Sequence, residues 1–370
     1  MPSALAHLKV IDLSRILAGP FASQTLGDMG AQVIKIEHPA GDDTRQWGPP
    51  FVERSDGSKD AAYYFCCNRN KKNICLDFTQ TSDRETLLQL INDADVLIEN
   101  YKVGGLRKYG LDYESIKHIN PSIIYCSITG FGQTGPYKDR PGYDALIQGM
   151  GGLMSITGEA DGPPQKVGVA VVDLMTGMYA TTAILAALNY RDQTGVGQHI
   201  DLALLDVQAA MLANQASTYL LSGVVPMRKG SAHPSIAPYE PIQVADGYIM
   251  LAIGNDKQFS ALCAAAGCEK IALDDKFSTN AARVNHRREL EGELKTYMMC
   301  KTIDEWIALG AQHGFPCGPI NTIDRVFDDA QLQSRNMLIS TEDGSRLVAN
   351  PIKFSETPIV HYTTPPTLKP

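Results

Sequence analysis

The chain has 370 residues, of which 44% are apolar and 20% charged, so it can bury a sizeable core and is long enough for two domains. Its formal net charge of -8 provides no basic surface for nucleic acid or an anionic membrane, and we expect neither as a partner. Eight cysteines without paired metal spacing predict buried free thiols in a reducing compartment, so we expect a cytoplasmic protein without a metal site.

The first half of the chain alternates between strand and helix patterns. Residues 7–12 and 32–37 are predicted strands, and residues 21–29 between them a helix that Gly19-Pro20 opens. The same unit follows again, with strands over 73–78, 95–99 and 122–128, a helix from Ser82 with Glu85 in a capping box, and a helix over 113–119. This order predicts an α/β domain with a mainly parallel sheet.

The N-terminus enters the first strand almost at once, so we expect no cleavable leader. No apolar run approaches membrane-spanning length, and we expect no membrane span.

The second half has a different pattern. An apolar helix is predicted over 198–221, a linker over 222–237, a hairpin about Asp246-Gly247, three helices between Lys257 and His313, and a second hairpin about Asp343-Gly344. The predicted domains are therefore 1–197 for the first part of the large α/β domain, 198–237 for a helix and crossover linker, 238–320 for a smaller α+β domain and 321–370 for a return to the large domain.

The loops after the strands of a parallel sheet are the expected ligand site. The first loop, SRILAGP, has one glycine where a dinucleotide fingerprint needs three, which disfavours NAD. Trp47 lies in a loop rich in Gly, Pro and Asp, which favours a pocket wall over core. The pair Cys66-Cys67 lies in an apolar stretch and is interpreted as buried and structural.

One carboxylate stands out from its surroundings. Asp173 follows an apolar stretch over 167–172 that is predicted to be a strand, and it precedes an apolar pattern at helical spacing. A common explanation is a helix N-cap, whose side chain accepts N–H bonds from the first turn. The alternative is a carboxylate in an apolar pocket whose basicity and nucleophilicity are set by burial. The two roles are compatible.

The sequence resembles the class III CoA-transferases of the formyl-CoA transferase and carnitine-CoA transferase type. The matching stretches lie between about residue 8 and about residue 355. They are LSRILAGPFASQTLGDMGAQVIKIEHPAGDDTRQWGPPF, NRNKKNICLD, ADVLIENY, IIYCSITGFGQTGPYKDRPGYD, VGVAVVDLMTG, GQHIDLALLD and PCGPIN. The block GDDTRQWGPPF also resembles the succinyl-CoA:glutarate CoA-transferase branch.

This resemblance implies a Rossmann-like large domain built from both chain ends, a small domain between them, and two polypeptide rings linked through each other as a homodimer. It implies that Asp173 is the nucleophile, that CoA enters as an acyl-CoA substrate, and that no cofactor is bound permanently. The substrate residues would include Trp47 and the loop at Gly254 and Asn255, which would act as a lid. The implied CoA-binding residues are Leu17, Ala18, His38, Leu76, Asp77, Phe78, Thr79, Asn100, Tyr101, Lys102, Lys108, Pro141, Gly142, Tyr143 and Asp144.

The expected reaction moves CoA from an acyl-CoA donor, such as succinyl-CoA, to a free carboxylic or dicarboxylic acid through an aspartyl-CoA intermediate. A dicarboxylate would need a cation for its distal carboxylate, and Arg45, Arg140 and Arg228 are the candidates.

Two alternatives remain. An α-methylacyl-CoA racemase would use acid-base chemistry on the same fold, but the racemases have a histidine where this chain has Tyr143. A CoA-binding protein without catalysis is disfavoured because Asp173 lies in its full motif.

Overall fold

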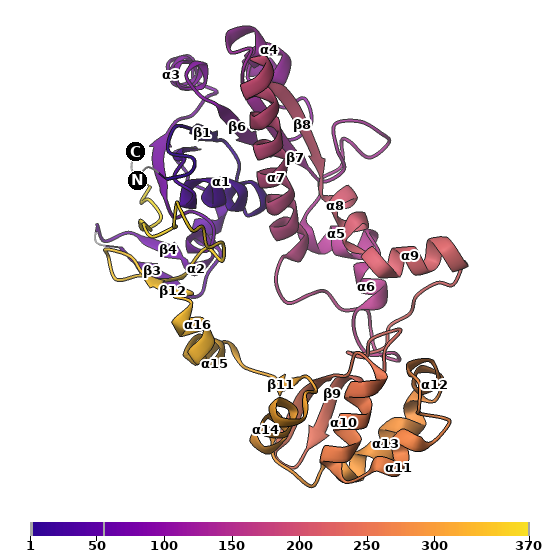
Figure 1. Cartoon of the computed structure of the whole chain (residues 1–370). Coiled ribbons are helices and arrows are strands. Elements are labelled where there is room, and N and C mark those ends of the chain that lie inside the picture. Colours follow the sequence, from indigo (N-terminus) through magenta and orange to yellow (C-terminus); the bar gives the residue numbers. More distant parts are fainter. Residues whose placement is uncertain (1–2, 55, 369–370) are drawn as a thin grey trace. The chain divides into compact units, whose positions relative to one another are not determined.

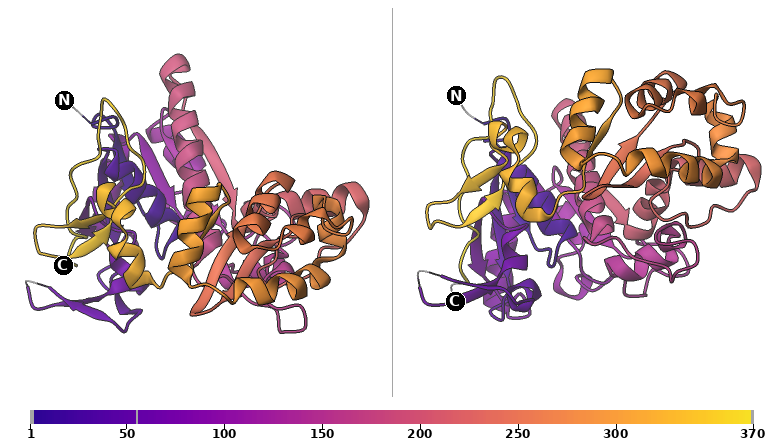
Figure 2. Two further views of the ribbon diagram at one scale, coloured as in Figure 1. Left: turned by 60° about the horizontal axis from the view of Figure 1, so that its bottom comes forward. Right: turned by 90° about the horizontal axis from the view of Figure 1, so that it is seen from below.

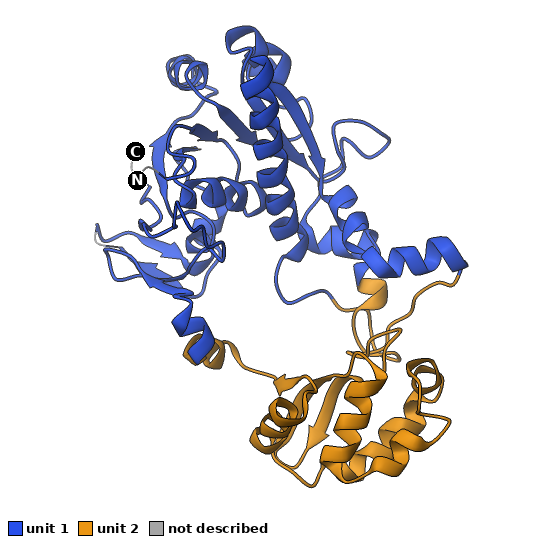
Figure 3. Cartoon of the chain, viewed as in Figure 1, with its two compact units in different colours: residues 1–153, 166–223, 330–370 blue, residues 154–165, 224–329 orange. Residues whose placement is uncertain are grey.

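The computed structural model describes residues 3–54 and 56–368. These residues form two compact units, shown in Figure 3. Unit 1 contains the residues up to 153, residues 166–223 and those from 330 onward, whereas unit 2 contains residues 154–165 and 224–329. Both ends of the chain therefore belong to unit 1.

Unit 1 is built on a six-stranded sheet with the strand order β5-β2-β1-β6-β7-β8, in which every pair is parallel (Figure 1). The prediction of a mainly parallel sheet is confirmed. The strands are β1 (Lys9–Asp12), β2 (Gln32–Glu37), β5 (Lys71–Cys75), β6 (Val96–Glu99), β7 (Ile124–Thr129) and β8 (Gln198–Ala203).

Successive residues of these strands pack into two different hydrophobic cores, one on each face of the sheet. Val10 packs in one core with Ala22 of α1 (Ala18–Asp28) and Ile184 of α7 (Val171–Thr194). The next residue, Ile11, packs in the other with residues of α3 (Thr81–Asn92) and α4 (Tyr113–Ile119). Because successive strand residues point to opposite faces, the sheet is covered by helices on both sides.

Smaller elements complete unit 1. They are η1 (Asp43–Gln46), β3 (Phe51–Glu53), β4 (Lys59–Ala61), α2 (Ala62–Phe65), η2 (Arg107–Tyr109), α5 (Asp144–Met150), α6 (Leu153–Ile156, which crosses into unit 2), α8 (Leu204–Met211), α9 (Ala213–Ser222), α16 (Ala330–Ser334), β12 (Leu338–Ser340) and β13 (Arg346–Val348). The predicted hairpin about Asp343-Gly344 is confirmed by β12 and β13.

The C-terminal segment lies along the N-terminal part of unit 1, as the yellow and indigo ribbons in both views of Figure 2 show. The Arg69 guanidinium donates to the Val348 carbonyl at 2.7 Å, and the Asn350 amide donates to Asp28 at 3.0 Å. The Thr363 N–H donates to the Asn70 side chain at 2.7 Å. Residues 279 to 322 positions apart in sequence thus belong to one folded unit.

Unit 2 has its own antiparallel sheet, in which β10 (Gly247–Ala252) lies between β9 (Tyr239–Val244) and β11 (Cys317–Pro319). The predicted hairpin about Asp246-Gly247 is confirmed. The core of unit 2 contains Phe259 and Trp306. The Trp306 indole N–H donates to the Met298 carbonyl at 2.9 Å. The helices are α10 (Asp256–Ala266), α11 (Glu269–Leu273), α12 (Asn280–Asn285), α13 (Arg287–Met298), α14 (Ile303–His313) and α15 (Ile323–Asp328).

Several predicted elements are wrong. Residues 167–170 are irregular and α7 begins at Val171, so the predicted strand before Asp173 does not form. Residues 198–203 are strand β8 and not the start of a helix, because they pair with β7 at the edge of the sheet. The predicted capping box at Ser82 is absent, since α3 begins at Thr81 and the Asp83 carboxylate accepts the Asp77 N–H. Five helices, not three, lie between residues 256 and 313.

The expectation that no apolar run reaches membrane-spanning length is also wrong. Helix α7 has 24 residues and is long and apolar enough to cross a membrane by length and composition. In this structure, however, it packs against α1 and β7 as a core helix of unit 1.

Buried charges hold the loop that follows β1. The Lys35 ammonium lies 2.9 Å from the Asp42 carboxylate and donates to the Ser14 carbonyl, and Lys71 lies 3.1 Å from Asp12. All four charged side chains of these two pairs are fully buried. Burial alone would raise the pKa of Asp42, but the Lys35 charge and hydrogen bonds from Thr44 outweigh it and lower the pKa. Each charge is therefore tolerated only because its partner is present.

We predict that Lys35→Met destabilises the protein by about 3–5 kcal/mol, because it leaves the Asp42 carboxylate buried without a cation. Urea unfolding followed by circular dichroism measures this loss. The control is Lys276→Met, which removes a cation from the exposed pair with Glu289 and should cost far less, because solvent and salt screen exposed charges. Equal effects of the two substitutions would contradict the importance of burial.

Candidate active site

A cavity of about 770 Å³ lies in unit 1, lined by the loops that follow the strands of the large sheet. This is the edge at which parallel sheets bind ligands. Asp173 lines it, together with five cationic residues. These cations are Arg15, Lys102, Lys108, Lys138 and Arg140.

Most of the residues that the sequence assigned to CoA line this same cavity. Twelve predicted site residues come together here: Leu17, Ala18, Phe78, Thr79, Asn100, Tyr101, Lys102, Lys108, Pro141, Gly142, Tyr143 and Asp173. They come from four loops and the first turn of α7, which are far apart in sequence.

Other predicted residues do not line the cavity. Leu76 is buried in the core beneath α3, and the Asp77 carboxylate accepts the N–H and hydroxyl of Thr79 at 3.0 and 2.6 Å. His38 is exposed, and its ring accepts the Ala40 N–H at 3.1 Å. Trp47 is 44% exposed and contacts the Tyr63 ring edge-on at 5.3 Å.

The predicted lid residues belong to unit 2. The Asn255 side chain caps α10 by accepting the Gln258 N–H at 3.0 Å, and the Gly254 N–H donates to the Gln258 side chain at 2.8 Å. The loop is thus tied to the first turn of α10.

The position of Asp173 follows from a close crossing of two helices. A Cβ atom on Gly177 would lie 2.7 Å from the Ala18 carbonyl oxygen, so α7 can approach the start of α1 only with glycine there. Asp173 is one helical turn before Gly177, which brings its carboxylate to the cavity beside Leu17 and Ala18. Gly177 therefore allows this approach.

The side chain that caps α7 is Asp144. Its carboxylate accepts the N–H groups of Val172 and Asp173 at 2.8 and 3.3 Å, and the Gln148 amide at 2.6 Å. The N-cap position itself is Ala170, which has no capping side chain. The prediction that Asp173 caps the helix is therefore wrong. Asp144, which was predicted to bind CoA, does not line the cavity and turns its carboxylate to the backbone.

Asp173 is half-buried and forms no ion pair among the residues that the structure describes. Burial and then the negative charge of Asp144 raise the pKa of Asp173 from its ordinary 3.8 to about 7. A strongly shifted carboxyl in a cavity is a candidate for chemistry. Its oxygen atoms are not used for capping and remain available to a ligand.

The loop before α1 forms another part of the cavity wall and is strained. Ile16 has φ +73°, a rare conformation for a β-branched residue. The Asp42 carboxylate accepts the Ile16 N–H at 3.3 Å, and the Asn100 side chain bonds both the N–H and the carbonyl of Arg15. Asn100 therefore joins two loops of the wall.

Tyr63 does not line the cavity, but the charges of the site act on it, an effect that the sequence did not indicate. Burial is the largest cause of its raised pKa, and the charges of Asp173 and Asp144 are among the further causes. The carboxylates are thus near enough to act on its hydroxyl. The nearby Cys66 is exposed and not buried as predicted, whereas Cys67 is buried. In the sequence, Tyr63 begins the apolar stretch YYFCCN, and that pattern favours the protein core over a functional site.

The three arginines proposed for a distal carboxylate differ in their surroundings. Arg45 is buried and bonded to Glu37 and Asp60, so it is fully occupied. Arg228 donates to the carbonyls of Glu159 and Gly162 at 3.1 and 2.8 Å. Arg140 lines the cavity, with its guanidinium 3.9 Å from the Tyr137 ring centre. Of the three, only Arg140 shares a cavity with Asp173.

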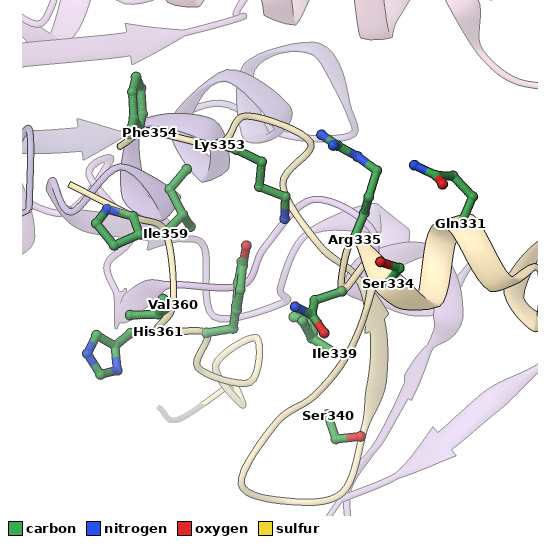
Figure 4. A pocket seen from close by; sticks show the side chains of 13 residues that line it. Gln331, Ser334, Arg335, Ile339, Ser340, Lys353, Phe354, Ile359, Val360 and His361 are labelled. Atoms are coloured by element: carbon green, nitrogen blue, oxygen red, sulfur yellow. The ribbon is translucent and has the colours of Figure 1, made fainter. Parts of the chain in front are cut away.

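A second large cavity, of about 830 Å³, is formed by the C-terminal segment between Gln331 and Tyr362 (Figure 4). It shares no lining residue with the cavity that contains Asp173, and no predicted site residue lines it.

Comparisons with known proteins give a consistent result. The model of a family described as CoA-transferase family III matches residues 5–369. The chain is 50% identical to a succinate–glutarate CoA-transferase of Agrobacterium fabrum, over 98% of this chain and 92% of that protein. It is 42% identical to the succinyl-CoA:glutarate CoA-transferase of Homo sapiens, over 98% of this chain and 83% of that protein. A CAIB/BAIF family protein from Brucella suis is 51% identical in sequence. Its crystal structure matches with a TM-score of 0.91, over 99% of this chain and 97% of that one.

The raised pKa of Asp173 makes a prediction about stability. A folded-state pKa of about 7 against an ordinary 3.8 means that ionisation of Asp173 opposes folding above pH 4, with the full effect above pH 7. Asp173→Asn removes this effect. We expect the variant to be more stable than the natural protein at pH 8 by about 1–3 kcal/mol, and the difference to vanish near pH 4. Thermal unfolding at both pH values measures it, and a variant that is less stable at pH 8 would contradict the electrostatic assignment.

Proposed function

The chain belongs to CoA-transferase family III, and on this premise we propose that it transfers CoA between carboxylic acids through a covalent aspartyl-CoA intermediate on Asp173. The observation that carries the proposal is the Asp173 carboxylate itself. It is half-buried, free of ion pairs within the described part of the chain, and exposed to a cavity rich in cations. A carboxylate in this state is a usable nucleophile once it is ionised.

The cavity suits CoA in size and charge. Its volume of about 770 Å³ is within the range of small-molecule sites, and five cationic side chains line it against three acidic ones, Asp43, Asp139 and Asp173. Phosphate groups of CoA would bind the cations, as anions do where Arg and Lys converge. The acyl thioester would then lie near Asp173.

The reaction uses only carboxylates and thiolates. Asp173 attacks the acyl-CoA carbonyl, and the C–S bond breaks to give a mixed anhydride and CoA thiolate. The thiolate attacks the aspartyl carbonyl, which forms aspartyl-CoA and releases the donor acid. The acceptor carboxylate attacks this thioester to give a second anhydride, and the thiolate then attacks the acceptor acyl carbonyl. The new acyl-CoA leaves, and Asp173 is restored.

The proposed donor is succinyl-CoA and the proposed acceptor a dicarboxylic acid such as glutarate. The names of the A. fabrum and human relatives support this choice. Arg140 is the candidate for the distal carboxylate, because it lines the cavity that contains Asp173. A panel of acyl-CoA donors and free acids, with product thioesters identified by mass spectrometry, tests it. Arg140→Met should weaken use of glutarate more than use of a monocarboxylate.

We predict that Asp173→Asn keeps the fold and lowers CoA transfer by at least about 10³-fold, because an amide cannot form the anhydride. Mass spectrometry of the natural protein incubated with succinyl-CoA alone should detect CoA, less one water, attached to the peptide that contains Asp173. Asp192→Asn, at the other end of α7, is the control and should leave transfer unchanged. Retention of a substantial part of the activity in Asp173→Asn would exclude Asp173 as the nucleophile.

The pH dependence of transfer should follow the ionisation of Asp173. Since its pKa is about 7 and only the carboxylate attacks, kcat/KM for succinyl-CoA should rise with pH through a midpoint near 7. Asp144→Asn removes a neighbouring negative charge and should move this midpoint to lower pH. Asp139→Asn removes a carboxylate that lines the cavity but is not among the groups that shift Asp173, and it should leave the midpoint in place.

We further propose a homodimer of interlocked chains. The family resemblance supports it, and so do large apolar side chains at the end of α9, where Tyr219, Leu220 and Leu221 are 50%, 76% and 88% exposed. Linked chains separate only on unfolding. Analytical ultracentrifugation should therefore give a dimer down to nanomolar concentration, and a folded monomer on dilution would contradict the proposal.

A further inference from the structure

One segment supplies much of the wall of the Asp173 cavity. Residues from 100 to 109 contribute eight lining side chains or backbone positions: Asn100, Tyr101, Lys102, Val103, Gly105, Leu106, Lys108 and Tyr109. Most of the segment bonds to itself, through pairs such as the Gly105 N–H with the Lys102 carbonyl at 2.8 Å. The shape of this wall therefore depends on how its two ends are held.

The two ends are held by side chains of neighbouring strands. At the start, the Glu99 carboxylate accepts the Tyr101 N–H at 2.8 Å. At the end, the Tyr125 hydroxyl donates to the Leu111 carbonyl at 2.7 Å. Glu99 ends β6, and Tyr125 lies on β7, so both anchors belong to the rigid sheet.

Glu99 is itself held by a chain of side chains across three strands. It lies opposite Ser127 in the register of β6 and β7, and the Ser127 hydroxyl bonds to its carboxylate. The Ser127 oxygen also lies 2.9 Å from Nε2 of His199 on β8. The His199 ring is fixed by stacking on Tyr113 at 4.9 Å.

A small cavity of about 50 Å³ separates the middle of the wall from this chain. It is lined by Glu99, Ser127 and His199 on the sheet side and by Lys102, Val103 and Leu106 on the wall side. These last three residues also line the cavity that contains Asp173. The segment is thus a partition between the two cavities, and Leu106 joins it to the core on this face of the sheet. Glu99 is only 5% exposed and forms no ion pair with any described residue.

We propose that Glu99 is a positioning residue for acyl-CoA: by anchoring Tyr101 to the sheet, and being held in turn by Ser127 and His199, it fixes the wall from Tyr101 to Leu106 in the shape that receives CoA. This rests on the proposed function, since it assumes that CoA binds along this wall. Glu99 lies behind the wall and does not line the Asp173 cavity. Its loss should therefore weaken acyl-CoA binding without changing the chemical step at Asp173.

The test compares two substitutions of similar size. Glu99→Gln keeps an oxygen that accepts the Tyr101 N–H, whereas Glu99→Leu leaves that N–H without a partner. We expect Glu99→Leu to raise KM for succinyl-CoA about tenfold with kcat within about twofold, and Glu99→Gln to stay within about threefold of the natural KM. A general loss of structure would instead lower the active fraction and kcat without changing KM.

Two further variants make the outcome decisive. Ser127→Ala removes the support of Glu99 and should raise KM about threefold, which keeps the proposal testable if Glu99→Leu does not fold. Asp112→Asn changes another carboxylate that lines the small cavity but bonds to Ser115 of α4, and it should leave KM unchanged.

Calorimetric titration with CoA separates this proposal from the proposed function. If the natural protein binds CoA and Glu99→Leu binds it equally well, the positioning role of Glu99 is wrong and the proposed function stands. If the natural protein itself does not bind CoA, both proposals fall.

Discussion

The candidate site depends on one carboxylate that caps a helix it does not belong to. Asp144, on α5, accepts the N–H groups at the start of α7, where most helices use a side chain of their own N-cap residue. This arrangement has two effects on Asp173. It leaves the Asp173 oxygen atoms free to meet a ligand. It also adds a negative charge nearby, which, after the larger effect of burial, raises the pKa of Asp173 to about 7. The Asp144 side chain thus both caps α7 and contributes to the raised pKa of Asp173.

The walls around Asp173 are loops, and polar side chains make them rigid. Paired charges in the interior hold the backbone from Ser14 to Ile16, and Asn100 links this loop to the segment after β6. Buried ion pairs contribute little net stability compared with apolar packing, but they enforce one geometry, because any other arrangement leaves a charge without a partner. The strained backbone conformation of Ile16 persists because these surroundings fix it. In an ordinary loop the backbone would relax to a common conformation. The buried charges therefore define the shape of the cavity more than they stabilise the fold.

Much of this was predictable from the sequence. The family resemblance and the enzyme class are confirmed by the comparisons, and the alternating apolar patterns located most strands of the large sheet. The errors have local causes. The stretch before Asp173 is apolar without being extended, and β8 was predicted to be helical because it runs directly into the apolar helix α8 without a turn residue between them. The roles of Asp144, Asn100 and Tyr63 depend on contacts between residues far apart in sequence, for which a pattern within one segment carries no signal. The division into domains and the residues that touch CoA remain predictions.

The return of the C-terminal segment to unit 1 affects the order in which the protein can fold during synthesis. Arg69, Asp28 and Asn70 belong to the first fifth of the chain, yet their partners are Val348, Asn350 and Thr363. A nascent chain that emerges from the ribosome must therefore keep these polar groups hydrated while about 280 further residues are made, and unit 2 can complete its own core during that time. Unit 1 is therefore completed last, although all six strands of its large sheet lie before residue 204. The stability of unit 1 consequently depends on the early and the late segments together, because loss of the late segment would remove these partners of Asp28, Arg69 and Asn70.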